Sequence, residues 1–314
     1  MRLFGDGDLE KALEPTLLME RIAAAFRSGA TAPLRHHHAF AKNAAGESTL
    51  LLMPAWSDRH VGVKIASVVP GNAARGLASV QATYLLLDAE TGAPLAVFEG
   101  REMTLRRTAA ASALASRALS RPDSARLLLV GAGALAPHLA RAHAQVRPIR
   151  DIAVWNRAPA RAETAVATLA ADPALKGIAV AAASDLAAAV ATADVISTAT
   201  LAIEPLIRGA WLKPGQHLDL VGSFRPHMRE ADDDVLRRAS LYCDTRAGAT
   251  RESGDLADPL ARGVISPEDI RADLFDLHRP GAWVRHSTDE ITLFKSVGHA
   301  LEDLAAAILA FENG

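Results

Sequence analysis

The stretch LLLVGAGALA, residues 127–136, decides the fold of this chain. An apolar run typical of a buried strand ends in Gly131, Gly133 and Ala136 at GxGxxA spacing, and an amphipathic helix pattern follows. Gly131 allows a tight strand-to-helix turn, Gly133 lets the backbone approach a pyrophosphate, and Ala136 lets helix and strand pack closely. The start of such a helix offers unpaired N–H groups to phosphate. We therefore expect a dinucleotide to bind here.

Residues at the end of the next strand are expected to contact the ribose of that dinucleotide. The run DIAVW (151–155) ends in Asn156 and Arg157, where NAD-specific folds usually carry Asp or Glu. Without a carboxylate the ribose 2′-hydroxyl loses its usual partner, whereas Arg157, with Arg161 one helical turn further on, can pair with a 2′-phosphate. The sequence therefore favours NADPH as the cofactor, with NADH as a less favoured alternative.

The composition is that of a globular protein, with 314 residues, 50% hydrophobic and 22% charged. A net charge of -2, with arginines scattered among acids, argues against a nucleic-acid surface and favours a small-molecule partner. Cys243 is the only cysteine, which excludes an intramolecular disulfide and a cysteine-rich zinc site, and we expect it to be buried in a strand. The acidic N-terminus differs from a signal peptide, and no uncharged apolar run approaches about 18 residues, so we expect a cytoplasmic protein with no membrane partner.

Residues 120–287 alternate short β-branched runs with alanine-rich helical runs, which is the pattern of βαβ units. We expect an α/β fold with a Rossmann-type doubly wound parallel sheet. Its six strands are expected at 126–130, 151–155, 177–182, 194–198, 217–222 and 240–243. Ligands of such sheets bind beyond the carboxyl ends of the strands, so the loops 198–200 and 222–224 are expected to flank the nicotinamide.

Residues 1–119 have a different pattern, which predicts a smaller α+β domain. A helix at 14–28 precedes strand-like runs at 49–56, 60–69, 79–88 and 94–100, separated by turn residues. In the final segment, 288–314, apolar residues recur at helical spacing from Val297 to Phe311, and we expect this helix to pack back on the first domain.

Three cations, Arg35, Lys64 and Arg107, interrupt apolar segments of the first domain that we interpret as strands. Burying a cation without a partner is costly, so each one either pairs with an acid or binds an anion. In the local sequence, only Asp58 and Glu102 offer an acid near Lys64 or Arg107. Three such cations in a domain joined to a nucleotide-binding fold favour an anionic ligand.

Longer segments resemble the ornithine cyclodeaminase and mu-crystallin family over nearly the full length. The matching segments are LLMPA (51–55), GVKIASVVPGN (62–72), LLLDAETGAPLAVFEGREMTLRRTAAASALA (85–115), VGAGALA (130–136), VGSFRPHMRE (221–230) and ITLFKSVGHALEDLAAA (291–307). The resemblance implies a homodimer that pairs through the first domain and reduces, or internally deaminates, small α-imino or α-amino acids. It also implies that Arg35, Lys64 and Arg107 hold the substrate carboxylate, a task suited to bidentate arginine and point-charge lysine.

Departures from the family pattern narrow the implied activity. Where cyclodeaminases and related alanine dehydrogenases have an aspartate this chain has Ser223, and where cyclodeaminases have a glutamate it has Leu51. Both changes remove carboxylates that would serve the amines of ornithine. The segment 221–230 and Lys295 are instead similar to the ketimine reductase branch, which implies reduction of Δ1-pyrroline-2-carboxylate to L-proline and of Δ1-piperideine-2-carboxylate to L-pipecolate.

Reduction of a cyclic ketimine needs oriented hydride transfer and an anchored carboxylate, because the imine is already an electrophile. The donor of the proton to nitrogen stays open among Lys64, water and the histidines His36, His37 and His38, and we take Lys64 as the candidate catalytic residue. Successive strand residues face opposite sides, so we expect no metal at the histidines. Ser223 and Val297 are also assigned to the substrate. The cofactor is further assigned Ser79, Arg107, Ala134, Leu135, Thr198, Thr200, Gly222 and Ser296.

Other activities stay open at this point. They are an ornithine cyclodeaminase, a dehydrogenase of alanine-like or N-alkyl amino acids, and a non-catalytic mu-crystallin-like protein that holds cofactor and a small ligand. The sequence does not choose between five- and six-membered rings.

Overall fold

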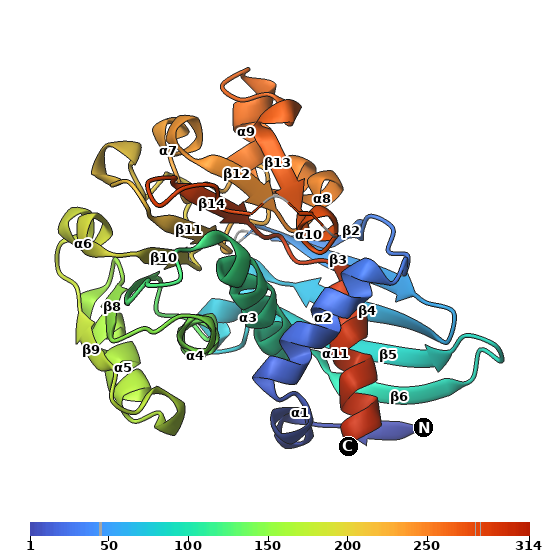
Figure 1. The fold of residues 1–314 in the computed structure, drawn as a ribbon. Coiled ribbons are helices and arrows are strands. Elements are labelled where there is room, and N and C mark those ends of the chain that lie inside the picture. Colours follow the sequence, from blue (N-terminus) through green and yellow to red (C-terminus); the bar gives the residue numbers. More distant parts are fainter. Residues whose placement is uncertain (44–45, 280, 283) are drawn as a thin grey trace. The chain divides into compact units, whose positions relative to one another are not determined.

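A computed structural model describes residues 1–43, 46–279, 281–282 and 284–314, and the chain forms two compact units (Figure 1). Unit 1 comprises residues 1–108 and 298–314, and unit 2 comprises residues 109–297. These boundaries differ from the expected 119 and 288. The second half of one helix belongs to unit 2, and so does a strand that begins at Thr292.

Unit 1 is built on a six-stranded sheet in the order β1-β6-β5-β4-β3-β2, in which only the β1–β6 pair is parallel. Its strands are β1 (Arg2–Phe4), β2 (His36–Asn43), β3 (Gly46–Trp56), β4 (His60–Val68), β5 (Val80–Asp88) and β6 (Pro94–Glu99). The four strands predicted from 49 to 100 are confirmed. The two edge strands were not predicted, since β1 is short and β2 carries mostly exposed side chains.

Helices cover one face of this sheet (Figure 1). They include α1 (Asp6–Ala12), α2 (Pro15–Arg27) and α11 (Ala300–Asn313), and α3 (Gly100–Leu119) begins here. As the apolar spacing of 297–311 predicts, α11 packs on unit 1, against α2 and strands β3, β4 and β5. The prediction that Arg35 and Arg107 lie in strands is wrong, because Arg35 precedes β2 and Arg107 lies in α3. Residues 107–116 are buried without a break, so α3 lacks the polar stripe that marks a surface helix.

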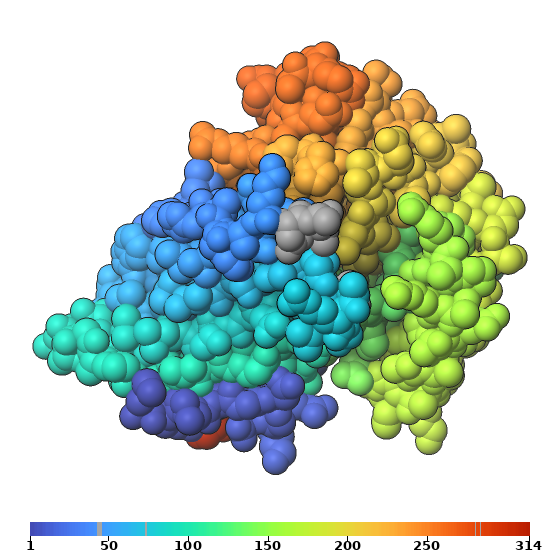
Figure 2. Space-filling model, turned by 180° about the vertical axis from the view of Figure 1, so that it is seen from behind, coloured from blue at the N-terminus to red at the C-terminus, as the bar shows by residue number. Residues whose placement is uncertain are grey.

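The opposite face of the sheet carries apolar side chains that unit 1 leaves partly uncovered. Strand alternation and register place Val63 and its paired neighbours on this side, whereas Lys64 points to the helix-covered side. Figure 2, seen from behind, shows β2 to β6, coloured blue to teal, at the surface. The apolar residues of this open face are Leu50, Leu52, Val61, Val63, Ile65, Leu85, Leu87 and Val97.

Unit 2 is a doubly wound α/β fold, as predicted, on a wholly parallel eight-stranded sheet in the order β13-β12-β14-β11-β10-β7-β8-β9. Its strands are β7 (Arg126–Val130), β8 (Asp151–Trp155), β9 (Ala179–Ala182), β10 (Val195–Thr198), β11 (His217–Leu220), β12 (Ser240–Cys243), β13 (Ile270–Asp273) and β14 (Thr292–Lys295). The first six were predicted and the last two were not. The late strand β14 inserts between β11 and β12.

Short helices connect these strands. They are α4 (Leu135–Val146), α5 (Pro159–Ala170), α6 (Leu186–Thr192), α7 (Asp233–Arg238), α8 (Arg246–Glu252), α9 (Gly254–Ala261) and α10 (Leu274–Leu277). Short 3-10 helices lie at Pro173–Leu175, Gly209–Trp211 and Pro267–Asp269 in unit 2, and a longer one at Pro70–Arg75 in unit 1. Cys243 is buried in β12, as expected. Among the described helices, none combines the length and apolar character that a membrane crossing requires.

Candidate active site

The turn between β7 and α4 has the geometry that the glycine motif predicts. Gly131 has φ +113°, and a Cβ atom there would lie 2.5 Å from the carbonyl oxygen of Ala199, so only glycine fits. At Gly133, by contrast, no heavy atom of the described residues lies within 4 Å of where a Cβ would be. Ala134 is the N-cap residue of α4 and makes no side-chain hydrogen bond to the first turn. Ala136 is buried. This exposed cradle of backbone N–H groups suits a pyrophosphate.

The loop after β8 presents cations and no acid. The Oδ1 atom of Asn156 accepts a hydrogen bond of 2.9 Å from the backbone N–H of Ala158, which fixes the turn into α5. The side chains of Arg157 and Arg161 are exposed, and the segment 156–161 contains no carboxylate. Nothing in this loop therefore opposes a ribose phosphate.

The loops after β10 and β11 meet at the same edge of the sheet. A Cβ atom on Gly222 would lie 2.1 Å from the carbonyl oxygen and 2.2 Å from the nitrogen of Thr200, so these backbones touch. Thr198 ends β10 beside Val130 of β7, and its buried hydroxyl has no hydrogen-bond partner among the described residues. The structure thus brings Thr198, Thr200 and Gly222 together with the glycine turn.

One residue joins these two loops, and sequence reasoning missed it. The side chain of Glu230 is fully buried and accepts hydrogen bonds from the backbone N–H groups of both Thr200 (2.8 Å) and Gly222 (2.7 Å). The Thr200 hydroxyl donates a third bond of 2.8 Å. Burial raises the pKa of the Glu230 carboxyl, Lys295 opposes that rise, and Asp255 adds to it. The only local signal was a glutamate beside the predicted loop 222–224.

Ser223 is buried, and its hydroxyl is already engaged. Its Oγ atom donates to the carbonyl of Met228 at 2.6 Å and lies 2.8 Å from the Oγ atom of Ser253. A direct hydrogen bond from Ser223 to a substrate would require this arrangement to open, so its direct role stays a prediction. The neighbouring β14 is followed by Ser296, which donates its backbone N–H to Leu220 (3.0 Å).

Val297 is held by a second missed acid. The backbone N–H of Val297 donates to Asp244 Oδ2 at 2.7 Å, and the Ser296 hydroxyl lies 3.4 Å from the same oxygen. Asp244 is fully buried directly after β12. Ser296 and Val297 therefore have fixed positions beside β11, and their assigned contacts with cofactor and substrate stay predictions.

Two of the three cations singled out in unit 1, Lys64 and Arg107, pair with two carboxylates from α11. Lys64 donates to Asp303 Oδ1 at 2.9 Å and lies 2.7 Å from Oδ2, while Arg107 pairs with Asp303 (2.9 Å) and Glu302 (2.6 Å). Arg35, just before β2, donates to the carbonyl of Gly298 at 2.5 Å. All of these side chains except Arg35 are fully or almost fully buried. Of the two alternatives left open for these cations, pairing with an acid is therefore realised for Lys64 and Arg107.

The acids were missed because they lie far away in the sequence. The Lys64–Asp303 and Arg107–Asp303 pairs are separated by 239 and 196 residues. Adjacent acids in the otherwise apolar helix 300–310 were the available signal. Two buried cations from β4 and α3 thus share the carboxylate of Asp303, and such a cluster of fixed cations suits an anionic ligand.

Burial sets the ionisation of this cluster. It lowers the pKa of Lys64 to about 8, with a further lowering from Arg107, while Asp303 acts in the opposite direction. Burial alone would raise the pKa of Asp303, but Arg107 and Lys64 hold it below its usual range. Lys64 is therefore an ammonium at neutral pH that can release a proton slightly above it.

The remaining predicted residues lie in unit 1. His36, His37 and His38 open β2 with exposed side chains, and the rings of His36 and His38 lie 6.3 Å apart, edge to face, as strand alternation implies. In the described part of the chain, no cluster of three His, Cys, Asp or Glu residues could hold a metal. Ser79 precedes β5 and accepts a backbone hydrogen bond from Val69 (2.7 Å), and its role at the cofactor stays a prediction.

Comparisons with known proteins place this chain among enzymes. The profile of the ornithine cyclodeaminase/mu-crystallin family matches residues 7–314. The Δ1-pyrroline-2-carboxylate reductase of Paracoccus denitrificans is 44% identical over 263 residues, which are 82% of this chain and 81% of that protein.

Solved structures resemble it over the full length. The Δ1-pyrroline-2-carboxylate reductase of Thermococcus litoralis, in complex with NADH and L-proline, superposes with a TM-score of 0.93 at 34% identity and covers 100% of this chain and 97% of its own. An archaeal alanine dehydrogenase dimer with bound NAD gives a TM-score of 0.92 at 27% identity, with 100% and 95% covered.

Proposed function

Because the chain belongs to the ornithine cyclodeaminase/mu-crystallin family, we propose that it is an NAD(P)H-dependent reductase of cyclic imino acids. Its substrates are Δ1-pyrroline-2-carboxylate, reduced to L-proline, and Δ1-piperideine-2-carboxylate, reduced to L-pipecolate. The observation that carries this proposal is the pair of buried cations Lys64 and Arg107, which the carboxylate of Asp303 holds in place. A relative 44% identical is itself a Δ1-pyrroline-2-carboxylate reductase.

The residues of unit 2 fit a nicotinamide dinucleotide. The open space at Gly133 and the uncapped start of α4 would receive the pyrophosphate, and the loops at Thr200 and Gly222 would adjoin the nicotinamide. When bound, the reduced cofactor supplies the hydride for the imine carbon. The similar structures of this fold contain NADH or NAD. For this chain we propose a preference for NADPH, because Arg157 and Arg161 suit a 2′-phosphate.

The substrate carboxylate would bind to the cations of unit 1. Arg107 can offer a planar pair of N–H groups, and Lys64 can offer a point charge. The carboxylate of Asp303 accepts hydrogen bonds from both side chains and so keeps them in place. Lys64 is also the proposed donor of the proton that balances hydride addition, since its pKa of about 8 leaves it protonated at neutral pH. The carbon gains the hydride, the ring nitrogen gains the proton, and the C=N double bond becomes single.

We further propose a homodimer paired through the open face of unit 1. Eight apolar side chains on one side of a sheet are costly to leave in water, and a second copy offers the same apolar face. A similar structure of this fold is a dimer. Pairing of identical faces would remove the apolar side chains of both copies from water at once.

A panel of substrates tests the activity. Oxidation of NADPH and of NADH would be followed with the five- and six-membered cyclic imino acids, and with pyruvate plus ammonia or methylamine. A separate assay would look for proline from ornithine. Rapid oxidation with cyclic imines alone is expected. Turnover limited to pyruvate and amine would replace this proposal with an amino acid dehydrogenase, and tight cofactor binding without any turnover would indicate a binding protein.

A further inference from the structure

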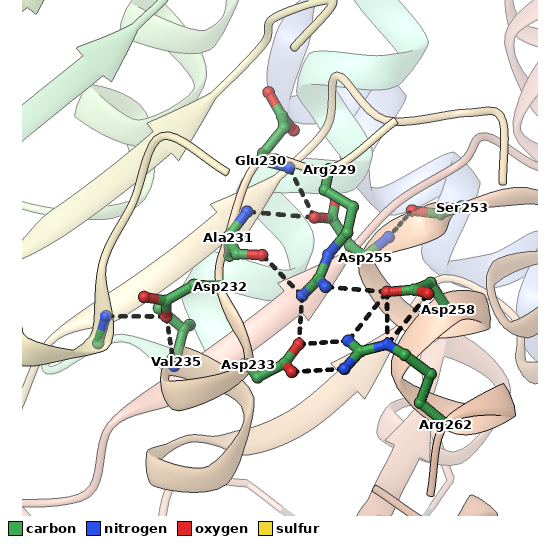
Figure 3. Close-up of polar contacts among 11 residues, drawn as sticks. Arg229, Glu230, Ala231, Asp232, Asp233, Val235, Ser253, Asp255, Asp258 and Arg262 are labelled. Atoms are coloured by element: carbon green, nitrogen blue, oxygen red, sulfur yellow. Dashed lines mark hydrogen bonds and ion pairs between the residues drawn. The ribbon is translucent and has the colours of Figure 1, made fainter. Parts of the chain in front are cut away.

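The segment 229–233, which leads from the loop after β11 into the start of α7, is held by helix α9 (Figure 3). Oδ1 of the buried Asp255 accepts hydrogen bonds from the backbone N–H groups of Glu230 (2.7 Å) and Ala231 (3.2 Å). The carbonyl of Glu230 accepts in turn from Leu206 and Ile207, both at 2.9 Å. The main chain of Glu230 is therefore fixed on both sides.

Ion pairs nearer the surface reinforce this grip. Arg229 pairs with Asp258 (2.9 Å) of α9 and with Asp233 (2.8 Å), and Arg262 pairs with the same two carboxylates at 2.9 and 2.7 Å. Two arginines and two aspartates thus form a closed ring, visible in Figure 3. Single surface pairs contribute little, but a connected ring resists rotation of any one side chain.

In Figure 3 the Glu230 carboxylate points away from this ring, and its hydrogen bonds join it to the loops that follow β10 and β11. There its Oε1 atom receives both the N–H and the hydroxyl of Thr200, and its Oε2 atom receives the N–H of Gly222. Each carboxylate oxygen therefore serves a different loop. The backbones of Gly222 and Thr200 also lie so close together that no Cβ atom fits at Gly222.

A buried cation balances the acids around this site. Lys295, at the end of β14, lies 3.3 Å from Asp255 Oδ2, and both side chains are fully buried. The positive charge of Lys295 thereby favours the carboxylate form of Glu230, which accepts the three hydrogen bonds. No role in substrate or cofactor contact is required of either residue.

We propose that Glu230 is a positioning residue that locks the Thr200 and Gly222 loops into one arrangement, which receives the nicotinamide half of the cofactor. This inference rests on the proposed cofactor site. Its consequence is specific: Glu230 acts on the reacting end of the dinucleotide, whereas binding of the adenosine diphosphate part depends on Gly133, Asn156 and Arg157. A change at Glu230 should therefore weaken binding of the nicotinamide half of the cofactor and leave binding of the other half nearly unchanged.

The test is Glu230→Gln, which keeps size but replaces one acceptor oxygen with an NH2 group that faces an N–H donor. We expect the affinity for ADP-ribose, which lacks nicotinamide, to stay within about twofold, while kcat/KM for NADPH and Δ1-pyrroline-2-carboxylate falls at least about tenfold, since such donors position a reacting group. The dissociation constant of NADPH, measured by fluorescence, should rise with that fall. Glu204→Gln, at an exposed acid of the same region, is the matched control and should change none of these values.

Equal weakening of ADP-ribose and NADPH would overturn the inference, because it would mean that Glu230 supports the whole fold of unit 2. Unchanged kinetics and NADPH affinity would overturn it as well. If Glu230→Gln fails to fold, Thr200→Val, which removes one of the three bonds, is judged by the same criteria with a smaller expected effect. The binding measurements need no turnover. They therefore decide the role of Glu230 even if the wild-type protein reduces no imine, a result that would refute only the proposed reductase activity.

Discussion

The ammonium nitrogen of Lys64 lies 2.7 Å from one carboxylate oxygen of Asp303 and 2.9 Å from the other, in the interior of unit 1. Arg107 shares this carboxylate. Removing one member of a buried ion pair usually leaves a costly unpaired charge, but here Asp303 would keep a partner if Lys64 were lost. The function of Lys64 can therefore be tested by substitution, because Asp303 would still be paired with Arg107.

Lys64→Met should lower kcat/KM for cyclic imino acids by at least about 100-fold, because carboxylate binding and proton donation are lost together. The fold should persist, with a moderate decrease in melting temperature. Steady-state kinetics and thermal unfolding measure the two effects. Lys42→Met, at an exposed lysine of β2, is the control. Near-normal turnover in a folded Lys64→Met protein would refute the assigned role.

The pKa of about 8 for Lys64 predicts an alkaline limit to activity. If the ammonium form is required, kcat/KM should fall as pH rises through about 8. Lys64→Arg, whose cation does not titrate in this range, should be slower but lose this fall. A fall that persists unchanged in the arginine variant would assign it to another group.

The same shift has a defined sign for stability. The pKa of Lys64 is lower in the folded protein than its ordinary value of 10.5, so the unfolded chain binds more protons from about pH 8 upward. Through this group, the free energy of unfolding rises with pH in that window. Loss of activity near pH 8 would therefore not reflect unfolding caused by Lys64.

Arg157→Ala should raise the Michaelis constant for NADPH about 5- to 150-fold and leave that for NADH nearly unchanged, because a charge-assisted contact to the 2′-phosphate is worth about 1 to 3 kcal/mol. Initial rates with each cofactor measure this difference. Arg150→Ala is the control, because Arg150 is also exposed but precedes the start of β8, whereas Arg157 follows its end. Equal effects on both cofactors would show that Arg157 does not read the phosphate.

Local pattern was sufficient for the elements that fix the cofactor site. Strand β7, the turn at Gly131 and strand β8 follow one another in sequence, so their apolar periodicity and glycine spacing predict them directly. The partners of Lys64 and Arg107 could not be read in the same way, because α11 supplies them from the far end of the chain. Strand β14 was missed for a related reason: its four residues lie inside the sheet, between β11 and β12, although they follow the edge strand β13 in the chain.

Ile65→Glu should dissociate the proposed homodimer. Ile65 lies on the open face of unit 1 and is 43% exposed in the single chain. Across a two-fold axis each substitution occurs twice, so burying the new carboxylates should raise the dimer dissociation constant by at least about 100-fold. Light scattering after size-exclusion chromatography measures the mass. Leu17→Glu, on α2, should leave the dimer intact, and a wild-type monomer would refute the interface.

The final prediction separates the reductase from an ornithine cyclodeaminase. A cyclodeaminase must oxidise ornithine to an imine, expel ammonia after internal attack and reduce the ring, and the first step needs a base for a substrate that is mostly ammonium at neutral pH. The Ser223 hydroxyl cannot accept and hold a proton as a carboxylate does, and it already donates to Met228. Leu51 packs with Ala66 and Val68 and offers no charge to the distal amine.

Asp303 is the buried carboxylate that Lys64 and Arg107 share, and these two cations keep its pKa low, which makes it a weak base. We therefore expect rapid NADPH-dependent reduction of preformed cyclic imine and no measurable proline from ornithine with catalytic NAD. Ser223→Asp, with its fold verified by circular dichroism, tests whether the missing carboxylate alone is limiting. Ornithine conversion by the unmodified protein, with ammonia released in step, would mean that another residue serves as the base and that deamination belongs to this site.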